Sequence, residues 1–191
     1  FFVVELSNLN IKNGLCISLG ANIDSKFGNP IESLIICKPR LEEIIKSWIK
    51  NSAPFKKEIE SSEVIFYWSS IYESSPHGVL DNQPNYLNTL VLVKSNSFPI
   101  SSEENAKSLL KELKNLERNF GRKETPINRK WLSRCLDLDI LWWENFNLID
   151  NELTLPHPRF MNRNFVITPL CEVLSRLQKI KKLDDPRWDI Y

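Results

Sequence analysis

Two aspartates separated by a single residue are the strongest chemical signal in this sequence. Asp137 and Asp139 lie in the segment RCLDLDIL, residues 134–141, in which acidic and apolar residues alternate. On a β-strand the two carboxylates would share one face, with Cα atoms about 6.6–7 Å apart, while the apolar residues face the other side. Carboxylates so close repel each other unless cations lie between them, and two Mg²⁺ ions that also bind substrate phosphates would satisfy both. The simpler alternative is a strand whose acidic face is exposed to solvent.

A basic segment leads up to these aspartates. Between residues 118 and 134 only Glu124 is acidic, and the basic residues are Arg118, Arg122, Lys123, Arg129, Lys130 and Arg134. A cationic segment beside a diacid favours a ligand that is both anionic and metal-binding, such as a nucleoside triphosphate with Mg²⁺. A solvated basic loop is the alternative. The sequence has no glycine-rich phosphate loop and no G-x-S-x-G element, so ATP chemistry here would proceed without a Walker motif.

Three further side chains could line a binding site. Glu117 falls on the apolar stripe of a predicted helix, so its carboxylate must find a partner or line a cavity unless it lies at the rim of the helix end. Tyr86 and Asn88 share one face of a predicted strand. An aromatic ring beside a carboxamide can hold a flat heterocycle by stacking and paired hydrogen bonds.

A proline-framed histidine follows near the C-terminal end. His157 lies between two prolines in residues 155–159, and the prolines restrict its backbone. Arg163 and Phe165 add a cation and an aromatic ring a few residues later. A lone histidine is more often structural, so the frame favours a binding role only slightly.

The elements that must position these residues follow from apolar periodicity. Strands are predicted at 15–19, 64–72, 86–94 and 135–143, with a short extended piece at 153–156. Helices are predicted after Pro30, across 102–120 with a capping box from Ser101 and Glu104, and from Thr168-Pro169 to about residue 180. Pro39 should kink or split the first helix. The order strand, helix, strand, strand, helix, strand predicts an α+β, ferredoxin-like βαββαβ sandwich, with an antiparallel sheet, helices on one face and C-terminal additions.

Composition predicts an ordinary globular chain. The 191 residues carry a net charge of +1 and 42% hydrophobic residues, which favours one domain over 1–191, with a leader of uncertain order at 1–13 and a core at about 15–174. Neither a nucleic-acid nor a membrane partner is expected, and no signal peptide or 18-residue apolar run is present. Four cysteines without a CxxC pair predict free buried thiols in a reducing cytosol and no zinc site.

At this point the motifs resemble a known family, the hydroxymethyl-dihydropterin pyrophosphokinases. The matching pieces, in the order of the family, are Ser18–Asn22, Ser70–Ser74, Gln83–Asn88, Leu116-Glu117 with Gly121-Arg122, Arg134–Leu141, Leu155–Arg159 and Arg163–Val166. The aspartate segment together with Leu-Pro-His is the most specific part. The sequence departs from the family at Leu132-Ser133, where Gly-Pro is usual, and at Ala21, where serine is usual.

The resemblance implies both an activity and a set of site residues. The enzyme would transfer pyrophosphate from ATP to 6-hydroxymethyl-7,8-dihydropterin, giving the pterin diphosphate and AMP in tetrahydrofolate biosynthesis. By this analogy two Mg²⁺ ions are held by Asp137 and Asp139, which act in catalysis with Arg122 and Arg134. ATP would be bound by Glu117, Ile140, Thr154, His157 and Arg163, and the pterin by Ser74, Tyr86, Asn88, Trp131 and Phe165. A stand-alone, monomeric, cytoplasmic enzyme is expected.

Two other functions compete with this interpretation. A two-metal nucleotidyltransferase also places two aspartates on a strand, but it would need a Gly-Ser element before them, which Leu132-Ser133 does not supply. A non-catalytic ferredoxin-like module that binds nucleic acid would present aromatic residues on its sheet among basic ones. That alternative leaves the aspartate pair unexplained.

Overall fold

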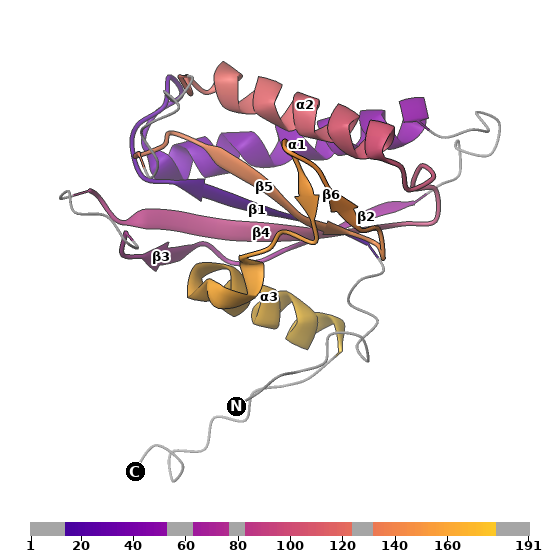
Figure 1. Ribbon diagram of the computed structural model, residues 1–191. Coiled ribbons are helices and arrows are strands. Elements are labelled where there is room, and N and C mark those ends of the chain that lie inside the picture. The colour runs from indigo at the N-terminus through magenta and orange to yellow at the C-terminus, as the bar shows by residue number, and fades with distance from the viewer. Residues whose placement is uncertain (1–13, 53–62, 77–82, 124–131, 179–191) are drawn as a thin grey trace, which may run out of the picture.

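A five-stranded antiparallel sheet forms the centre of the molecule (Figure 1). The computed structural model describes residues 14–52, 63–76, 83–123 and 132–178. The elements are β1 (Leu15–Ala21), α1 (Pro30–Ser52), β2 (Val64–Trp68), β3 (Tyr72–Ser74), β4 (Tyr86–Ser95), α2 (Glu103–Asn119), β5 (Asp137–Trp143), β6 (Leu148–Ile149), β7 (Thr154–Leu155), a 3₁₀ turn (Phe160–Asn162) and α3 (Asn164–Leu177). The strand order is β2-β4-β1-β5. Strand β3 also pairs with β4, outside this order, and β6 and β7 form a separate hairpin.

Side-chain alternation along the strands separates two cores. Odd-numbered residues of β1, such as Ile17 and Leu19, face a large core under α1 and α2, together with Leu138 and Ile140 of β5. On the opposite face, the sheet packs against α3 and forms a smaller core. This core contains Trp142 and Leu170. Figure 1 shows α1 and α2 side by side on one side of the sheet and α3 on the other. The predicted α+β class and antiparallel sheet are confirmed, and the arrangement is compatible with a ferredoxin-like sandwich. The two helices of the predicted βαββαβ core, α1 and α2, lie on one face as expected, and α3, a C-terminal addition, covers the other face.

Two helices differ from the prediction, and each contains a proline. Helix α1 continues through Pro39 without splitting. Pro39 is exposed, so the carbonyl that its missing N–H leaves unpaired lies on the side open to water, while Cys37 and Leu41 stay buried in the core. Helix α3 begins at Asn164, four residues before the predicted start, and Pro169 is buried inside it.

Strand boundaries and one cap also differ. The predicted strand 64–72 is divided into β2 and β3, because Ser69 leaves the regular pairing and bonds β4 through its own side chain. Strand β5 begins at Asp137, two residues later than predicted. The N-cap of α2 is Ser102, which accepts a hydrogen bond from the Asn105 N–H, in place of the predicted Ser101 capping box. Gly121, with φ of 100°, follows the end of α2 as predicted.

The cysteines and the helices can also be compared with the prediction from sequence. All four cysteines are free, and three are buried as predicted, whereas Cys171 is exposed on α3. Within the described part of the chain, no helix is long and apolar enough to cross a membrane.

Candidate active site

A row of residues across the sheet brings two groups of predicted site residues together. Gly20 of β1 pairs with Asn88 of β4 on one side and with Asp137 of β5 on the other. All three lie on the face of the sheet that packs against α3. Two strand spacings put Asn88 and Asp137 about 10 Å apart. Because glycine has no side chain, the sheet between the two polar groups is bare, and a Cβ at this position would lie 3.4 Å from Asn88 Oδ1.

Asp137 is held by two arginines. Arg122 Nη1 donates to Asp137 Oδ1 at 2.6 Å, and Arg134 donates to the other carboxylate oxygen. Burial alone would raise the pKa of Asp137, but the charges of Arg134 and Arg122 outweigh it and hold the pKa below its ordinary value. Asp137 is therefore ionised and neutralised within the protein.

Asp139 has a different environment on the same strand face. Among the residues that the structure describes, Arg163 is its ion-pair partner, with Nη1 3.6 Å from Oδ2. Burial and the charge of Asp137 raise the pKa of Asp139, and His157, Lys114 and Arg163 only partly oppose them. The pair thus has one strongly neutralised carboxylate and one that gains from an additional cation.

Glu117 connects the helix layer to the site. Its side chain is 1% exposed, and Oε1 accepts a hydrogen bond from the Leu138 N–H at 2.7 Å and pairs with Arg122 Nη1 at 2.5 Å. Lys114 Nζ lies 3.2 Å from Oε2. Burial raises the pKa of Glu117, and Lys114 and Arg122 oppose the rise. The prediction that a carboxylate at this position must find partners is confirmed, and these partners join α2, Arg122 and β5.

His157 is anchored beside β5 through its backbone. Its N–H donates to the Leu141 carbonyl at 2.7 Å, and its ring Nδ1 accepts from the Arg159 N–H at 3.2 Å. The neutral ring therefore carries its proton on Nε2. Burial lowers the pKa of His157, and the charge of Asp139 opposes this effect.

The aromatic half of the site lies on β3 and β4. Ser74 pairs with Tyr86 in the sheet, and its Oγ accepts a hydrogen bond from Asn88 Nδ2 at 2.9 Å. The Tyr86 hydroxyl donates to the Leu132 carbonyl at 3.3 Å, which brings the segment before β5 over to β4. Pairing and this hydrogen bond join the three residues, of which Asn88 is buried, and Gly20 separates them from Asp137.

The remaining predicted site residues have fewer described contacts with this group. Phe165 lies on the first turn of α3, with the Arg163 guanidinium 5.5 Å from its ring centroid. Thr154 lies on β7. The Ile140 side chain belongs to the core under α1 and α2, so only its backbone is available on the site face. Trp131 lies outside the described residues, as do Arg129 and Lys130.

Sequence reasoning gave no role to Asn22 and Gly20, although both belong to a motif that it singled out. Asn22 is 2% exposed and bonds to two distant segments. The neighbours of Gly20 follow from the sheet register, and the partners of Asn22 lie 62 and 112 positions away along the chain. No local pattern in the sequence could have revealed them.

The donor set fits Mg²⁺ with substrate phosphates. Asp137 and Asp139 offer hard carboxylate oxygens on one face, with side chains 20% and 33% exposed. Within the described residues, no three His, Cys, Asp or Glu side chains gather closely enough to enclose a metal ion. Mg²⁺ keeps several waters and binds through one or two carboxylates plus phosphates, so two carboxylates meet its needs.

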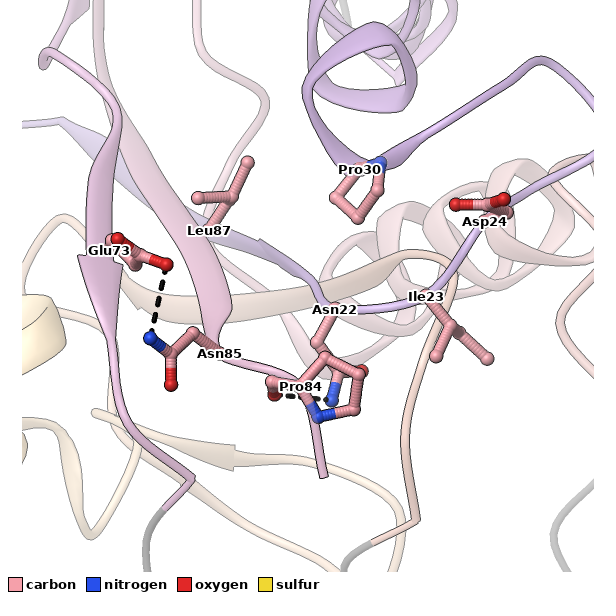
Figure 2. Close-up of a pocket in the computed structure, with 8 residues that line it drawn as sticks. All are labelled: Asn22, Ile23, Asp24, Pro30, Glu73, Pro84, Asn85 and Leu87. Carbon is pink, nitrogen blue, oxygen red and sulfur yellow. Dashed lines mark hydrogen bonds between the residues drawn. The ribbon is translucent and has the colours of Figure 1, made fainter. Parts of the chain in front are cut away.

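A separate hollow lies at the edge of this region (Figure 2). It has a volume of about 750 Å³ and is lined by Asn22, Ile23, Asp24, Pro30, Glu73, Pro84, Asn85 and Leu87. None of these residues is a predicted site residue, and Leu87 belongs to the opposite face of β4 from Tyr86 and Asn88. The charged groups converge at the Asp137 end of the Asn88–Gly20–Asp137 row and not at this hollow.

Comparisons with known proteins place the chain in one family. Residues 16–175 match the family described as 7,8-dihydro-6-hydroxymethylpterin-pyrophosphokinase (HPPK). The chain is 39% identical over 109 residues to the 2-amino-4-hydroxy-6-hydroxymethyldihydropteridine pyrophosphokinase of Haemophilus influenzae, covering 57% of this chain and 61% of that protein. The protein of the same name from Bacillus subtilis is 35% identical over 111 residues, 58% of this chain and 60% of that protein.

A third relative is matched over more of its length. The Aquifex aeolicus protein of the same name is 30% identical over 157 residues, 82% of this chain and 78% of that protein. The chain therefore spans about three fifths of the first two relatives and more than three quarters of the third. Since the family match covers most of its length, the chain belongs to the 7,8-dihydro-6-hydroxymethylpterin-pyrophosphokinase family.

Proposed function

We propose that this chain transfers pyrophosphate from ATP to 6-hydroxymethyl-7,8-dihydropterin, as a step of tetrahydrofolate biosynthesis. The observation that carries the proposal is the row Asn88–Gly20–Asp137, in which a heterocycle-binding surface and a charged phosphate-binding surface face each other across a bare glycine. The names of the relatives support the same activity. The proposal includes a ferredoxin-like fold, which the antiparallel order β2-β4-β1-β5 supports.

In this proposal the pterin lies over β4. Ser74, Tyr86 and Asn88 provide the ring contact and the polar edge, and Phe165 of α3 and Trp131 complete the surface. The hydroxymethyl group then extends over Gly20 toward Asp137. Gly20 adds no side chain along that path.

The chemical step is attack by the hydroxymethyl oxygen on the β-phosphorus of ATP. The O–P bond forms as the bond from the β-phosphorus to the α-phosphate oxygen breaks, so AMP leaves and the pterin keeps both transferred phosphates. No covalent nucleophile is required, since positioning and charge neutralisation carry such reactions. The hydroxyl proton leaves to solvent or to a neighbouring carboxylate.

The arginines neutralise the triphosphate in this mechanism. Arg122 and Arg134 pair with Asp137. When ATP binds, they exchange part of this contact for phosphate oxygens, and Arg163 lies next to Asp139 to do the same. His157, whose pKa is lowered by burial, is neutral at pH 7 and can donate from Nε2. Thr154 and the Ile140 backbone are proposed to lie near the adenine.

Two Mg²⁺ ions would be held by Asp137 and Asp139. When bound, they supply the positive charge that stabilises the triphosphate oxygens during the displacement. Glu117 would position two of these groups from the helix layer. Its carboxylate pairs with Arg122 and accepts from the Leu138 N–H, and so holds one cation and the start of β5. The monomeric state and the cytoplasmic location stay predictions.

The test is incubation of the chain with MgATP and 6-hydroxymethyl-7,8-dihydropterin, followed by separation of the nucleotides. AMP formed in equal amount to pterin diphosphate, and only with both substrates and Mg²⁺, supports the proposal. Release of free pyrophosphate would instead indicate a nucleotidyltransferase. No nucleotide conversion together with RNA binding in a gel-shift assay would indicate the nucleic-acid-binding alternative.

A further inference from the structure

Asn22 stands where the two halves of the site meet. It follows the last residue of β1, two positions after Gly20, and it is 2% exposed. Its side-chain amide donates through Nδ2 to the Pro84 carbonyl and to Ser133 Oγ, each at 3.2 Å. Figure 2 shows this amide pointing toward Pro84.

The same residue fixes the backbone of Arg134. Asn22 Oδ1 accepts from the Arg134 N–H at 2.7 Å, and the Asn22 N–H donates to the Arg134 carbonyl at 2.9 Å. Asn22 thus uses both amide donors, its side-chain oxygen and its own N–H on two other segments. A buried carboxamide with this many partners is fully satisfied, and removing it would leave buried groups without partners.

Each of these segments leads directly into one half of the site. Pro84 lies two residues before Tyr86, which opens β4 and the aromatic surface. Arg134 carries the guanidinium that pairs with Asp137. The Tyr86 hydroxyl also donates to the Leu132 carbonyl, at 3.3 Å, and this contact is more exposed.

We propose that Asn22 is a positioning residue that sets the aromatic half of the site against the phosphate-binding half. It touches neither reacting atom in this proposal. Because its three side-chain bonds reach two segments at once, it fixes the position of Tyr86 relative to Arg134. The inference rests on the proposed pyrophosphate transfer, since it assigns the two halves to the two substrates.

This role predicts a specific kinetic pattern. In Asn22→Ala each half keeps its own contacts, so affinity for each substrate alone should stay within about threefold of wild type. The two substrates would no longer be aligned, and misplacement by about 1 Å costs on the order of 10²-fold in rate. The expected result is therefore a fall in kcat on the order of 10²-fold with little change in either Kd.

The experiment compares three variants in one assay of AMP formation, with calorimetric Kd values for pterin and for a non-hydrolysable MgATP analogue. Asn22→Asp has the same size and keeps an acceptor for the Arg134 N–H, but it loses both donors, so it should lower kcat by at least about tenfold. Asn85→Ala is the matched control. Asn85 lies in the same region and its Nδ2 donates to Glu73 Oε1 at 3.0 Å, but that contact is exposed and stays within the β3–β4 side.

The outcomes separate this inference from the proposed function. If wild type forms no AMP, the proposed function fails and the inference falls with it. If wild type is active and Asn22→Ala keeps more than about a third of its kcat, or loses only affinity for one substrate, only the inference is overturned. An equal loss in Asn85→Ala would overturn it as well. Should Asn22→Ala fail to show a cooperative melt, Asn22→Asp decides by the same criteria.

Discussion

At the scale of single residues, identical side chains have opposite electrostatic roles. Asp137 and Asp139 share one face of β5, yet two arginines hold the pKa of Asp137 low, while burial and its neighbour raise the pKa of Asp139. The ion pairs of Asp137 stabilise the local structure, whereas burial and the charge of Asp137 disfavour the charged form of Asp139. A cation beside Asp139 would favour its charged form.

Replacing each aspartate by asparagine tests this asymmetry. Both variants should lose more than tenfold in kcat, equivalent to more than about 1.4 kcal/mol, because each removes a negative charge from the proposed metal site. Asp137→Asn should lower the free energy of unfolding by about 1.5–3 kcal/mol, since two charged hydrogen bonds are weakened, whereas Asp139→Asn should leave it unchanged or raise it. Urea unfolding and the AMP assay measure the two effects.

Asp24→Asn, at an exposed position outside the site, is the control for both measurements. If Asp139→Asn destabilised the protein as much as Asp137→Asn, the electrostatic difference between the two positions would be refuted. If either variant kept more than about a tenth of the activity, the proposed metal role would be refuted.

Tyr86 and Asn88 allow the division of the site to be tested. Tyr86→Ala and Asn88→Ala should weaken pterin binding and leave MgATP binding unchanged, because both residues lie on β4, across Gly20 from Asp137. Losing a stacked ring should cost about 0.5–1.5 kcal/mol beyond the buried area. Calorimetric titration of each ligand measures this. Equal losses for both ligands would show that the two halves are not separate.

At the scale of elements, the short strand β3 depends on a contact from α3. Glu172 accepts from the Ser70 N–H at 2.8 Å, from Ser70 Oγ at 2.9 Å and from the Tyr72 hydroxyl at 3.0 Å. Arg176, which pairs with Glu172, also donates to the Trp68 carbonyl. These bonds fix the residues between β2 and β3. They thereby keep β3, which carries Ser74, next to β4.

Glu172→Gln should therefore destabilise the protein in a pH-dependent way. Burial alone would raise the pKa of Glu172, but its bonds to Ser70 and Tyr72 and the charge of Arg176 bring it below the ordinary value. The carboxylate thus contributes stability above the unfolded-state pKa of about 4.3 and loses it as pH falls below that value through the folded pKa. The variant should be about 1 kcal/mol less stable than wild type at pH 7, and the difference should shrink toward pH 3.

Urea unfolding at several pH values measures the difference. Glu112→Gln, at an exposed position on α2, provides a matched control that should show no such dependence. A deficit for Glu172→Gln that stayed constant between pH 7 and pH 3 would mean that its charge is not responsible.

The elements also show what the sequence could predict. Alternation identified β5 and the shared face of Asp137 and Asp139, because that signal is local. Contacts over long sequence separations could not be predicted: Asn22 reaches Arg134 across 112 positions, and Ser70 reaches Glu172 across 102. The early start of α3 was missed because Thr168-Pro169 resembles a helix start, whereas burial of Val166 against the sheet favours helix from Asn164.

At the scale of the whole molecule, the sheet separates two hydrophobic cores of unequal size. The core under α1 and α2 includes most of the large buried side chains, and α3 covers a smaller core on the other face. The candidate site lies on the α3 face, so the sheet forms its floor and α3, which packs on the smaller core, lies on the same side (Figure 1). Arg163 and Phe165 project from the start of that helix.

This inequality predicts the order of hydrogen exchange. Helix α3 buries Val166, Pro169, Leu170 and Val173, whereas α1 buries seven residues, so α3 should open at a lower free energy than β1 or α1. Amides of residues 170–175 should exchange before those of β1. A non-hydrolysable MgATP analogue should slow their exchange, because Arg163 would then bind phosphate as well as Asp139.

Val173→Ala and Leu113→Ala form a matched pair for this measurement, since the first removes buried groups under α3 and the second under α2. Val173→Ala should speed exchange in α3 and leave β1 unchanged, because only the smaller layer loses contacts. Leu113→Ala should lower global stability by about 2–5 kcal/mol and speed exchange everywhere that depends on global unfolding. If α3 exchanged together with β1 in wild type and in both variants, the two layers would form one cooperative unit, and the helix beside the site could not open on its own.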